Sequence, residues 1–272
     1  MTRAPATAKL NLALVVGPHR PDGKHEVTTI LQRVALTDRI SIRPSDQLHV
    51  DGFENDTLVR DALVRLADAA SVPPAWSARI DKRIPVAAGL GGGSSDAATA
   101  LRLANAKLAS PLSTDRLDDI ARAVGADVAF FLRNGPQLGE GDGGTLTPVD
   151  LPQDYFIVLV LPTSVEKTST RAVYGQFDAR GGANGYDERR ALLLERLANV
   201  RRARDLASLP QNDLATSPLA DELRAHGAFR ADVTGAGPVV YGLFLHRASA
   251  LAARRALRAH GRTWVTVPAW YG

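Results

Sequence analysis

A glycine-rich segment that follows a predicted strand is the part of the sequence most informative about chemistry. It reads Pro85-Val86-Ala87-Ala88-Gly89-Leu90-Gly91-Gly92-Gly93-Ser94-Ser95-Asp96, and an Ala-rich stretch with helical spacing comes next. Glycines let backbone N–H groups approach an anion closely, and a helix N-terminus adds partial positive charge. The Ser hydroxyls can reach a phosphate group or its magnesium ion. We therefore predict that residues 85–95 bind nucleotide phosphates, with Ser95 as the magnesium ligand.

The alternative for this segment is a flexible turn ahead of a capped helix. A lone pair of glycines favours that alternative, but here four glycines precede two serines at a strand-to-helix junction. The spacing is neither that of a Walker loop, since no Gly-Lys-Ser/Thr follows, nor that of a dinucleotide fingerprint, since Ser94 replaces its last glycine. We expect Asp96 to cap the helix, because a carboxylate beside bound phosphates repels them.

Two polar side chains lie close together on an earlier predicted strand. Residues 8–16 alternate with period two, which is typical of a half-buried strand. Lys9 and Asn11 share one face, about 6 to 7 Å apart at ~3.3 Å per residue. The opposite face carries Leu10, Leu12, Leu14 and Val16.

The remaining pattern predicts a mixed α+β protein with no visible internal repeat. We predict further strands at residues 39–43, 48–50, 76–84, 155–161, 229–234, 239–245 and 263–267. We predict helices at residues 57–70, 94–109, 115–124, 189–204 and 248–260, and a mobile loop at 175–186. A boundary near residues 148–154 separates two domains.

Composition excludes several kinds of site. The chain has 272 residues, 45% hydrophobic and 23% charged, which is typical of a globular protein. It has no Cys, which excludes disulfides, thiolate zinc sites, iron–sulfur clusters and cysteine nucleophiles. The six histidines show no close ligand spacing, so we expect no structural transition-metal site.

Charge and hydropathy limit the partners. No apolar run reaches the ~18 to 20 residues that span a bilayer, and the N-terminus lacks a signal pattern. We therefore expect a cytoplasmic protein without a membrane partner, monomeric or homodimeric. The net charge of +4 is spread along the chain, which gives a nucleic-acid partner little support and fits an anionic small substrate equally well.

The glycine-rich segment resembles the phosphate loop of GHMP kinases, the superfamily of galactose, homoserine, mevalonate and phosphomevalonate kinases. Other segments are similar to the 4-diphosphocytidyl-2-C-methyl-D-erythritol kinases of the non-mevalonate isoprenoid pathway. They are Ala6-Thr7-Ala8-Lys9-Leu10-Asn11-Leu12, Arg20-Pro21-Asp22-Gly23-Lys24-His25-Glu26, Gly125-Ala126-Asp127-Val128-Ala129-Phe130-Phe131, Gly139-Glu140-Gly141, Asn212-Asp213-Leu214 and Thr234-Gly235-Ala236-Gly237-Pro238. The resemblance implies the two-domain GHMP kinase fold. Its N-terminal ATP-binding domain, residues 1–151, is ribosomal protein S5 domain 2-like, and its C-terminal domain, residues 152–272, is ferredoxin-like.

The resemblance also implies catalytic roles. Transfer of a phosphoryl group from ATP to an alcohol needs charge neutralisation, a positioned hydroxyl and usually a carboxylate that takes its proton. The family's base falls on Asp127, the partner of this base on Lys9, and a substrate-positioning residue on Asn11. Without the resemblance, the residues alone favour Asp127 as an N-cap for residues 128–132, and Lys9 as a solvated charge on the strand face.

Four further residues are assigned to the substrate by the resemblance. His25 falls where the family hydrogen-bonds cytosine, and Tyr174 where it brings a second aromatic ring to that base. Gly235 belongs to a second glycine loop behind the site. The family usually has a stacking Tyr before the histidine, whereas this chain has Lys24, which can make a cation–π contact or meet a diphosphate. The alternatives are an exposed loop histidine for His25, a core aromatic for Tyr174 and a plain hairpin turn for Gly235.

The implied activity is ATP- and magnesium-dependent phosphorylation of the 2-hydroxyl of 4-diphosphocytidyl-2-C-methyl-D-erythritol. Lys24 leaves a second possibility open, a GHMP kinase for a different small alcohol. A third is a non-catalytic nucleotide-binding protein of the same fold, against which Lys9 and Asp127 argue.

Overall fold

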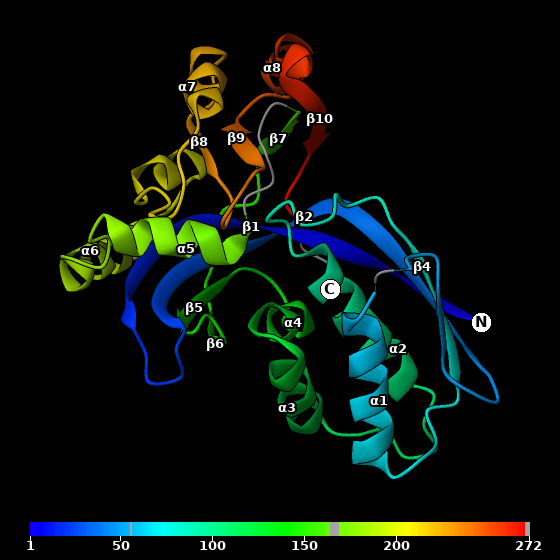
Figure 1. Ribbon diagram of the computed structural model, residues 1–272. Helices are drawn as coiled ribbons and strands as arrows, with labels where there is room; N and C mark the ends of the chain where they lie inside the picture. Colours follow the sequence, from blue (N-terminus) through cyan, green and yellow to red (C-terminus); the bar gives the residue numbers. More distant parts are fainter. Residues whose placement is uncertain (55, 164–168, 270–272) are drawn as a thin grey trace.

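The structure, a computed structural model, describes residues 1–54, 56–163 and 169–269. Within these residues the first half of the chain forms a six-stranded sheet. Its strands are β1 Thr2–His19, β2 His25–Pro44, β3 His49–Asp51, β4 Trp76–Asp81, β5 Gln137–Gly141 and β6 Thr145–Pro148. Their order is β3-β4-β2-β5-β6, and β1 pairs with β2 as a long antiparallel hairpin (Figure 1).

Strand β1 differs from its prediction because it is buried on both faces. A β-bulge shifts its register between Asn11 and Ala13, so Leu12 is the extra residue. The bulge reverses the alternation beyond it: Leu10 and Leu12 pack into the core between the two sheets, whereas Leu14 faces a different cluster, with Phe177. The predicted single leucine face is therefore wrong past Leu12.

Four helices cover one face of the first sheet (Figure 1). They are α1 Leu58–Ala70, α2 Gly92–Asn105, α3 Thr114–Val124 and α4 Ala126–Leu132. Helix α2 begins two residues earlier than predicted, because Gly91 takes a left-handed φ of 67° and is the N-cap itself. Ser94, Ser95 and Asp96 therefore lie inside the helix, and the predicted capping role of Asp96 is wrong.

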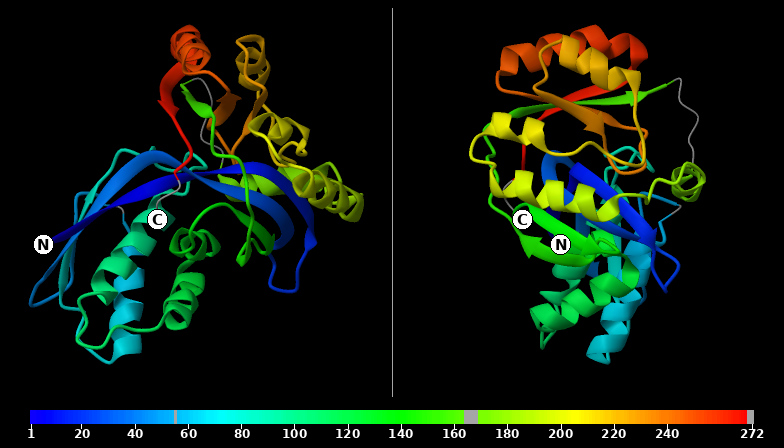
Figure 2. Two further views of the ribbon diagram at one scale, coloured as in Figure 1. Left: turned by 180° about the vertical axis from the view of Figure 1, so that it is seen from behind. Right: turned by 90° about the vertical axis from the view of Figure 1, so that its left-hand side faces the viewer.

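The second half of the chain forms a four-stranded antiparallel sheet. Its strands are β7 Phe156–Pro162, β8 Arg230–Val233, β9 Val240–Phe244 and β10 Gly261–Thr266. The order β10-β7-β9-β8 is ferredoxin-like. Helices α7 Pro218–Ala225 and α8 Arg247–Ala256, the latter followed by the 3₁₀ turn η2 Leu257–His260, cover the face turned away from the first sheet (Figure 2).

Helices α5 Thr170–Ala179 and α6 Tyr186–Ala198 run across β1, followed by the 3₁₀ turn η1 Ala203–Ser208 (Figures 1 and 2). The predicted loop at 175–186 is therefore wrong for residues 175–179 and 186, which are helical, whereas residues 180–185 form the turns between α5 and α6. Ser169 caps α5 by accepting a hydrogen bond from the Ala172 N–H, and Phe177 is buried, so the chain stays helical to residue 179. The predicted helix 189–204 is divided into α6 and η1.

The α+β prediction is confirmed, with omissions. The sequence pattern missed β5, β6, α4, α7 and most of β2. Strand β2 is buried on both faces over most of its length, so its alternation is weak. The expected division at residues 151 and 152 falls in the segment between β6 and β7. Among the described residues, no helix has the length and hydropathy to cross a bilayer.

Candidate active site

A cavity of about 1050 Å³ lies where β1, β2, the two glycine loops, α4 and α5 meet. The predicted site residues that line it are Lys9, Asn11, Lys24, His25, Ala87, Gly89, Gly91, Asp127, Tyr174 and Gly235. Among the described residues of the first loop, Pro85, Val86, Ala88, Leu90, Gly92, Gly93, Ser94 and Ser95 are not part of this lining. The structure therefore brings together residues that the sequence places more than 200 positions apart.

The catalytic pair predicted from the sequence lines this cavity. Lys9 is 6% exposed, and its Nζ donates a hydrogen bond of 2.7 Å to Asn11 Oδ1 and lies 3.7 Å from Asp127 Oδ2. Asp127 is the second residue of α4, whose N-cap is Gly125, so the N-cap alternative fails. A buried ammonium is stable only when paired or hydrogen-bonded, and here both partners are present.

The bulge in β1 and the hydrogen bonds around it fix the side chain of Asn11. Its Nδ2 donates to Thr29 Oγ1 at 2.8 Å, and the Thr29 hydroxyl donates to the Ala13 carbonyl at 2.7 Å. The Asn11 N–H donates to Thr234 Oγ1 at 3.1 Å. Because the amide nitrogen of Asn11 donates to Thr29, the amide oxygen is the atom that faces Lys9.

The first glycine loop is held against β1 and against the second glycine loop. The Lys9 N–H donates to the Leu90 carbonyl at 2.9 Å. A Cβ on Gly89, at φ 79°, would lie 2.4 Å from the Thr234 carbonyl oxygen, and one on Gly91 would lie 2.9 Å from Lys9 Cγ. These two positions require glycine. No side chain caps α2, so the free N–H groups of its first turn remain available to an anion.

Ser95 lies on a different side of α2. It is 1% exposed and lines a small cavity with Thr99 and Arg102, apart from the large one. The described structure therefore gives no support to Ser95 as a magnesium ligand.

Asp96 faces away from the large cavity too, in a buried cluster. Lys82 Nζ lies 2.9 Å from Asp96 Oδ2 and 2.6 Å from Asp38 Oδ2. Burial raises the pKa of Asp96 to about 8, against the attraction of Lys82, and the neighbouring Asp38 carboxylate adds to the rise. One lysine thus serves two carboxylates behind the phosphate loop.

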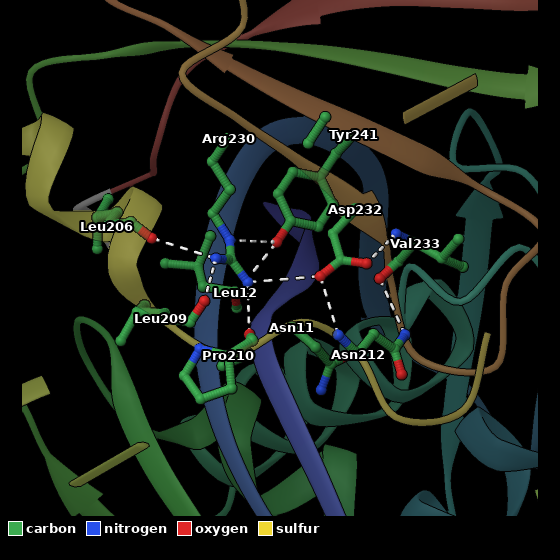
Figure 3. Close-up of polar contacts among 12 residues, drawn as sticks. Asn11, Leu12, Leu206, Leu209, Pro210, Asn212, Arg230, Asp232, Val233 and Tyr241 are labelled. Carbon is green, nitrogen blue, oxygen red and sulfur yellow. Dashed lines mark hydrogen bonds and ion pairs between the residues drawn. The ribbon is translucent and has the colours of Figure 1, made fainter. Parts of the chain in front are cut away.

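A buried polar network holds the second glycine loop (Figure 3). Asn212 Nδ2 donates to the carbonyls of Val233 and Gly235 at 2.9 and 2.7 Å, and the Asn212 N–H donates to Asp232 Oδ2 at 2.9 Å. Asp232 is paired in turn with Arg230 at 3.4 Å. Gly235, at φ 57°, is thereby fixed with its backbone against Asn11 and Lys9.

The same network reaches the bulge of β1. Arg230 donates to Tyr241 Oη at 3.2 Å, and the Tyr241 hydroxyl donates to the Leu12 carbonyl at 3.2 Å (Figure 3). Arg230 also donates to the carbonyls of Leu206, Leu209 and Pro210. One buried guanidinium therefore links the second sheet to the strand that carries Lys9 and Asn11. The sequence pattern gives no sign of this role of Arg230, because an isolated arginine in a strand carries no signal of burial.

The cavity has an aromatic end, lined by His25 and Tyr174. His25 is 8% exposed, so the exposed-loop alternative is wrong, and its ring lies 4.8 Å from that of Tyr174 at 33°. His25 Nε2 is 2.7 Å from Asp178 Oδ1, a hydrogen bond that lowers the pKa of Asp178. The ring of His19 lies 4.0 Å from that of His25.

Lys24 lies beside this aromatic end without entering its stack. The Lys24 side chain is 60% exposed. Its Nζ donates a hydrogen bond of 2.5 Å to Asp142 Oδ2, and this bond lowers the pKa of Asp142. Both Lys24 and Asp142 line the cavity.

Known proteins resemble the chain in sequence and in fold. The models described as GHMP kinases N terminal domain and GHMP kinases C terminal match residues 57–135 and 189–263. A 4-diphosphocytidyl-2-C-methyl-D-erythritol kinase of Salinibacter ruber is 36% identical over 274 residues, which cover 93% of each chain. The chain belongs to the 4-diphosphocytidyl-2-C-methyl-D-erythritol kinase family.

Solved structures agree with this membership. A crystal structure of a 4-(cytidine 5'-diphospho)-2C-methyl-D-erythritol kinase aligns over 100% of both chains with a TM-score of 0.80 at 31% identity. A mevalonate kinase crystal structure aligns over 98% of this chain and 99% of its own with a TM-score of 0.75 at 14% identity, which shows a shared fold. The resemblance and the two-domain GHMP kinase fold predicted from the sequence are confirmed. The individual residue roles remain predictions.

Proposed function

We propose that this protein transfers the γ-phosphoryl group of ATP to the 2-hydroxyl of 4-diphosphocytidyl-2-C-methyl-D-erythritol. The observation that carries the proposal is the buried Lys9 ammonium, 3.7 Å from the Asp127 carboxylate and next to the uncapped N-terminus of α2. The names of the relatives support the choice of substrate. The reaction is placed in the cytoplasm, without a nucleic-acid partner and with a monomeric or homodimeric enzyme.

In the proposed reaction, Asp127 orients the substrate hydroxyl and accepts its proton as the oxygen attacks phosphorus. Lys9 stabilises the negative charge that develops between the two, and its hydrogen bond to Asn11 holds the ammonium in place. The backbone N–H groups of the first loop and of α2 bind phosphate oxygens. Mg²⁺ neutralises phosphate charge in such reactions, and Ser95, which lies outside the cavity lining, is not placed to hold it.

The proposal assigns the cytosine to the aromatic end of the cavity, with His25 as a hydrogen-bonding group and Tyr174 as a ring for the base. The cavity, at about 1050 Å³, is large enough to hold a nucleotide-sized ligand. Lys24 stands where the family usually has a second stacking ring, and its ammonium is paired with Asp142. This pair is the observation that favours the second candidate, a kinase for another small alcohol of the GHMP type.

A substrate panel tests the proposal. The purified protein is given Mg²⁺-ATP with 4-diphosphocytidyl-2-C-methyl-D-erythritol, mevalonate, homoserine, galactose or no acceptor, and ADP release is measured. We expect turnover with the first acceptor and background rates with the others. Turnover with a different alcohol alone would replace the substrate, and ATP binding without turnover on any acceptor would favour the non-catalytic alternative.

A further inference from the structure

Three potential metal ligands meet at the aromatic end of the cavity. His19 ends β1, His25 begins β2 directly opposite it, and Asp178 lies in the last turn of α5. His25 Nε2 is 2.7 Å from Asp178 Oδ1, and His19 Nε2 is 3.3 Å from Asp178 Oδ2. Within the described part of the chain, this is the single group of three His, Cys, Asp or Glu residues with ligand atoms so close, all within 4.8 Å of one another.

These separations are close to those of a tetrahedral zinc site. Zn–N distances of about 2.0–2.1 Å and Zn–O distances of about 2.0–2.2 Å place the ligand atoms of a tetrahedral site roughly 3.3–3.5 Å apart. His25 Nε2 and His19 Nε2 lie 2.7 and 3.3 Å from different oxygens of Asp178, and one ligand atom of each residue lies within 4.8 Å of the other two. Side-chain rotations that move ligand atoms by ~1 Å therefore suffice, and the backbone can stay in place.

The surroundings of His25 hold its ring in advance. The His25 ring packs edge-on against Phe177 at 5.9 Å and lies 4.8 Å from Tyr174. The opposed positions of His19 and His25 are set by the antiparallel register of the β1–β2 hairpin. A ligand that is already held favours binding because less ordering is needed when the ion arrives. The His19 and Asp178 side chains, 60% and 39% exposed, complete the site from its solvent side.

We propose that His19, His25 and Asp178 bind one Zn²⁺ ion, with water in the fourth position, and that the ion ties the β1–β2 hairpin to α5. Imidazole nitrogens select zinc and its transition-metal neighbours, whereas Mg²⁺ prefers oxygen ligands. Micromolar Zn²⁺ therefore binds here in the presence of millimolar Mg²⁺. The sequence prediction of no structural transition-metal site rested on spacing along the chain. The hairpin and α5 bring the ligands together instead.

A bound ion also affects substrate binding, and this part of the inference rests on the proposed function. A His25 ring that coordinates zinc through Nε2 is held by the metal and no longer free to adjust to a base. Zn²⁺ is therefore a competitive inhibitor with respect to the cytidine-containing substrate, and its inhibition does not depend on ATP.

Calorimetric titration of the full chain with ZnCl₂, in the presence of Mg²⁺ and without any substrate, tests the site itself. We expect one ion per chain, and at least a tenfold weaker affinity in His19→Ala and in Asp178→Asn. His260→Ala is the matched control, because His260 Nε2 lies 2.9 Å from Glu222 Oε2 in a similarly exposed pair, with no third such ligand close by among the described residues. Circular dichroism confirms that each variant is folded.

Co²⁺ substitution supplies a second readout, since a tetrahedral site gives intense visible absorption that the control keeps and the two site variants lose. Unchanged zinc affinity in His19→Ala and Asp178→Asn, or an equal loss in His260→Ala, overturns the metal site. A repeat of the titration with saturating cytidine diphosphate then tests the competition separately. Zinc affinity unaffected by the nucleotide overturns the shared use of His25 while the metal site stands.

Discussion

Replacement of Gly89 by alanine tests how closely the two glycine loops must approach. Gly89 has φ 79°, and an added Cβ would lie 2.4 Å from the Thr234 carbonyl oxygen. That oxygen belongs to the backbone and is fixed beside Asn212, which binds the neighbouring carbonyls. An ordinary contact begins near 3.4 Å, so the loops must separate by about 3.4 − 2.4 = 1.0 Å.

The magnitude follows from this displacement. A misplacement of about 1 Å in a catalytic site can cost about 10²-fold in rate, or ~2.7 kcal/mol at 1.36 kcal/mol per factor of ten. The left-handed backbone adds roughly 1–2 kcal/mol of strain for a residue with a Cβ. We therefore expect Gly89→Ala to lower kcat/KM by about 100-fold and to lower the melting temperature by several degrees.

Gly93→Ala, in the first turn of α2, is the matched control from the same glycine-rich segment. Its added Cβ would meet one atom, Leu58 Cδ1 at 3.2 Å, which is the end of a flexible side chain, and its φ is not left-handed. The assay is steady-state ADP release, together with thermal unfolding of all three proteins. A Gly89→Ala enzyme within about threefold of the wild type, or a Gly93→Ala enzyme equally impaired, would refute the reasoning.

Three further predictions follow from contacts in and behind the site. The pKa of Asp96 is about 8 in the folded protein against an ordinary value of 3.8, so the free energy of unfolding falls as pH rises from about 4 to 8. We expect Asp96→Asn to flatten this slope in thermal unfolding curves recorded across that pH range. An unchanged slope contradicts the assignment. Arg230→Met leaves Asp232 buried without its partner, so urea unfolding should show a loss of roughly 3–5 kcal/mol, and a loss under 1 kcal/mol counts against the network. Lys24→Tyr places a ring beside the cavity and should lower KM for the cytidine-containing substrate about tenfold, within the ~1–3 kcal/mol of base stacking. Its control is Lys24→Ala, which loses only an exposed ion pair worth ~1 kcal/mol or less. Equal KM values in the two variants speak against a base at the aromatic end of the cavity.

Local patterns predicted the chemistry of the site better than its geometry. The i, i+2 spacing of Lys9 and Asn11 placed them on one strand face, and the structure shows their side chains hydrogen-bonded. The glycine segment was placed correctly between a strand and a helix. Both predictions depend on neighbours along the chain, for which the spacing of residues is sufficient information.

Features that depend on contacts distant in sequence were missed. The bulge at Leu12 arises from pairing with β2, and the alternating pattern of β1 alone gives no sign of it. Asp96 at the start of a helix resembles a cap, and the lysine that pairs with it lies 14 residues earlier in the chain. The approach of His19 to Asp178 depends on where α5 crosses the hairpin, over a separation of 159 residues.

The central claim is that Asp127 takes the proton from the substrate hydroxyl, whereas the first glycine loop and α2 bind the nucleotide phosphates. The most direct test compares the wild type with Asp127→Asn, following formation of the phosphorylated product from 4-diphosphocytidyl-2-C-methyl-D-erythritol by phosphorus NMR and measuring ATP affinity in parallel. The account predicts product with the wild type, a rate at least about 10²-fold lower with Asp127→Asn, and ATP affinities within a few-fold. A variant that turns over near the wild-type rate, or one that loses ATP binding and turnover equally, would contradict it.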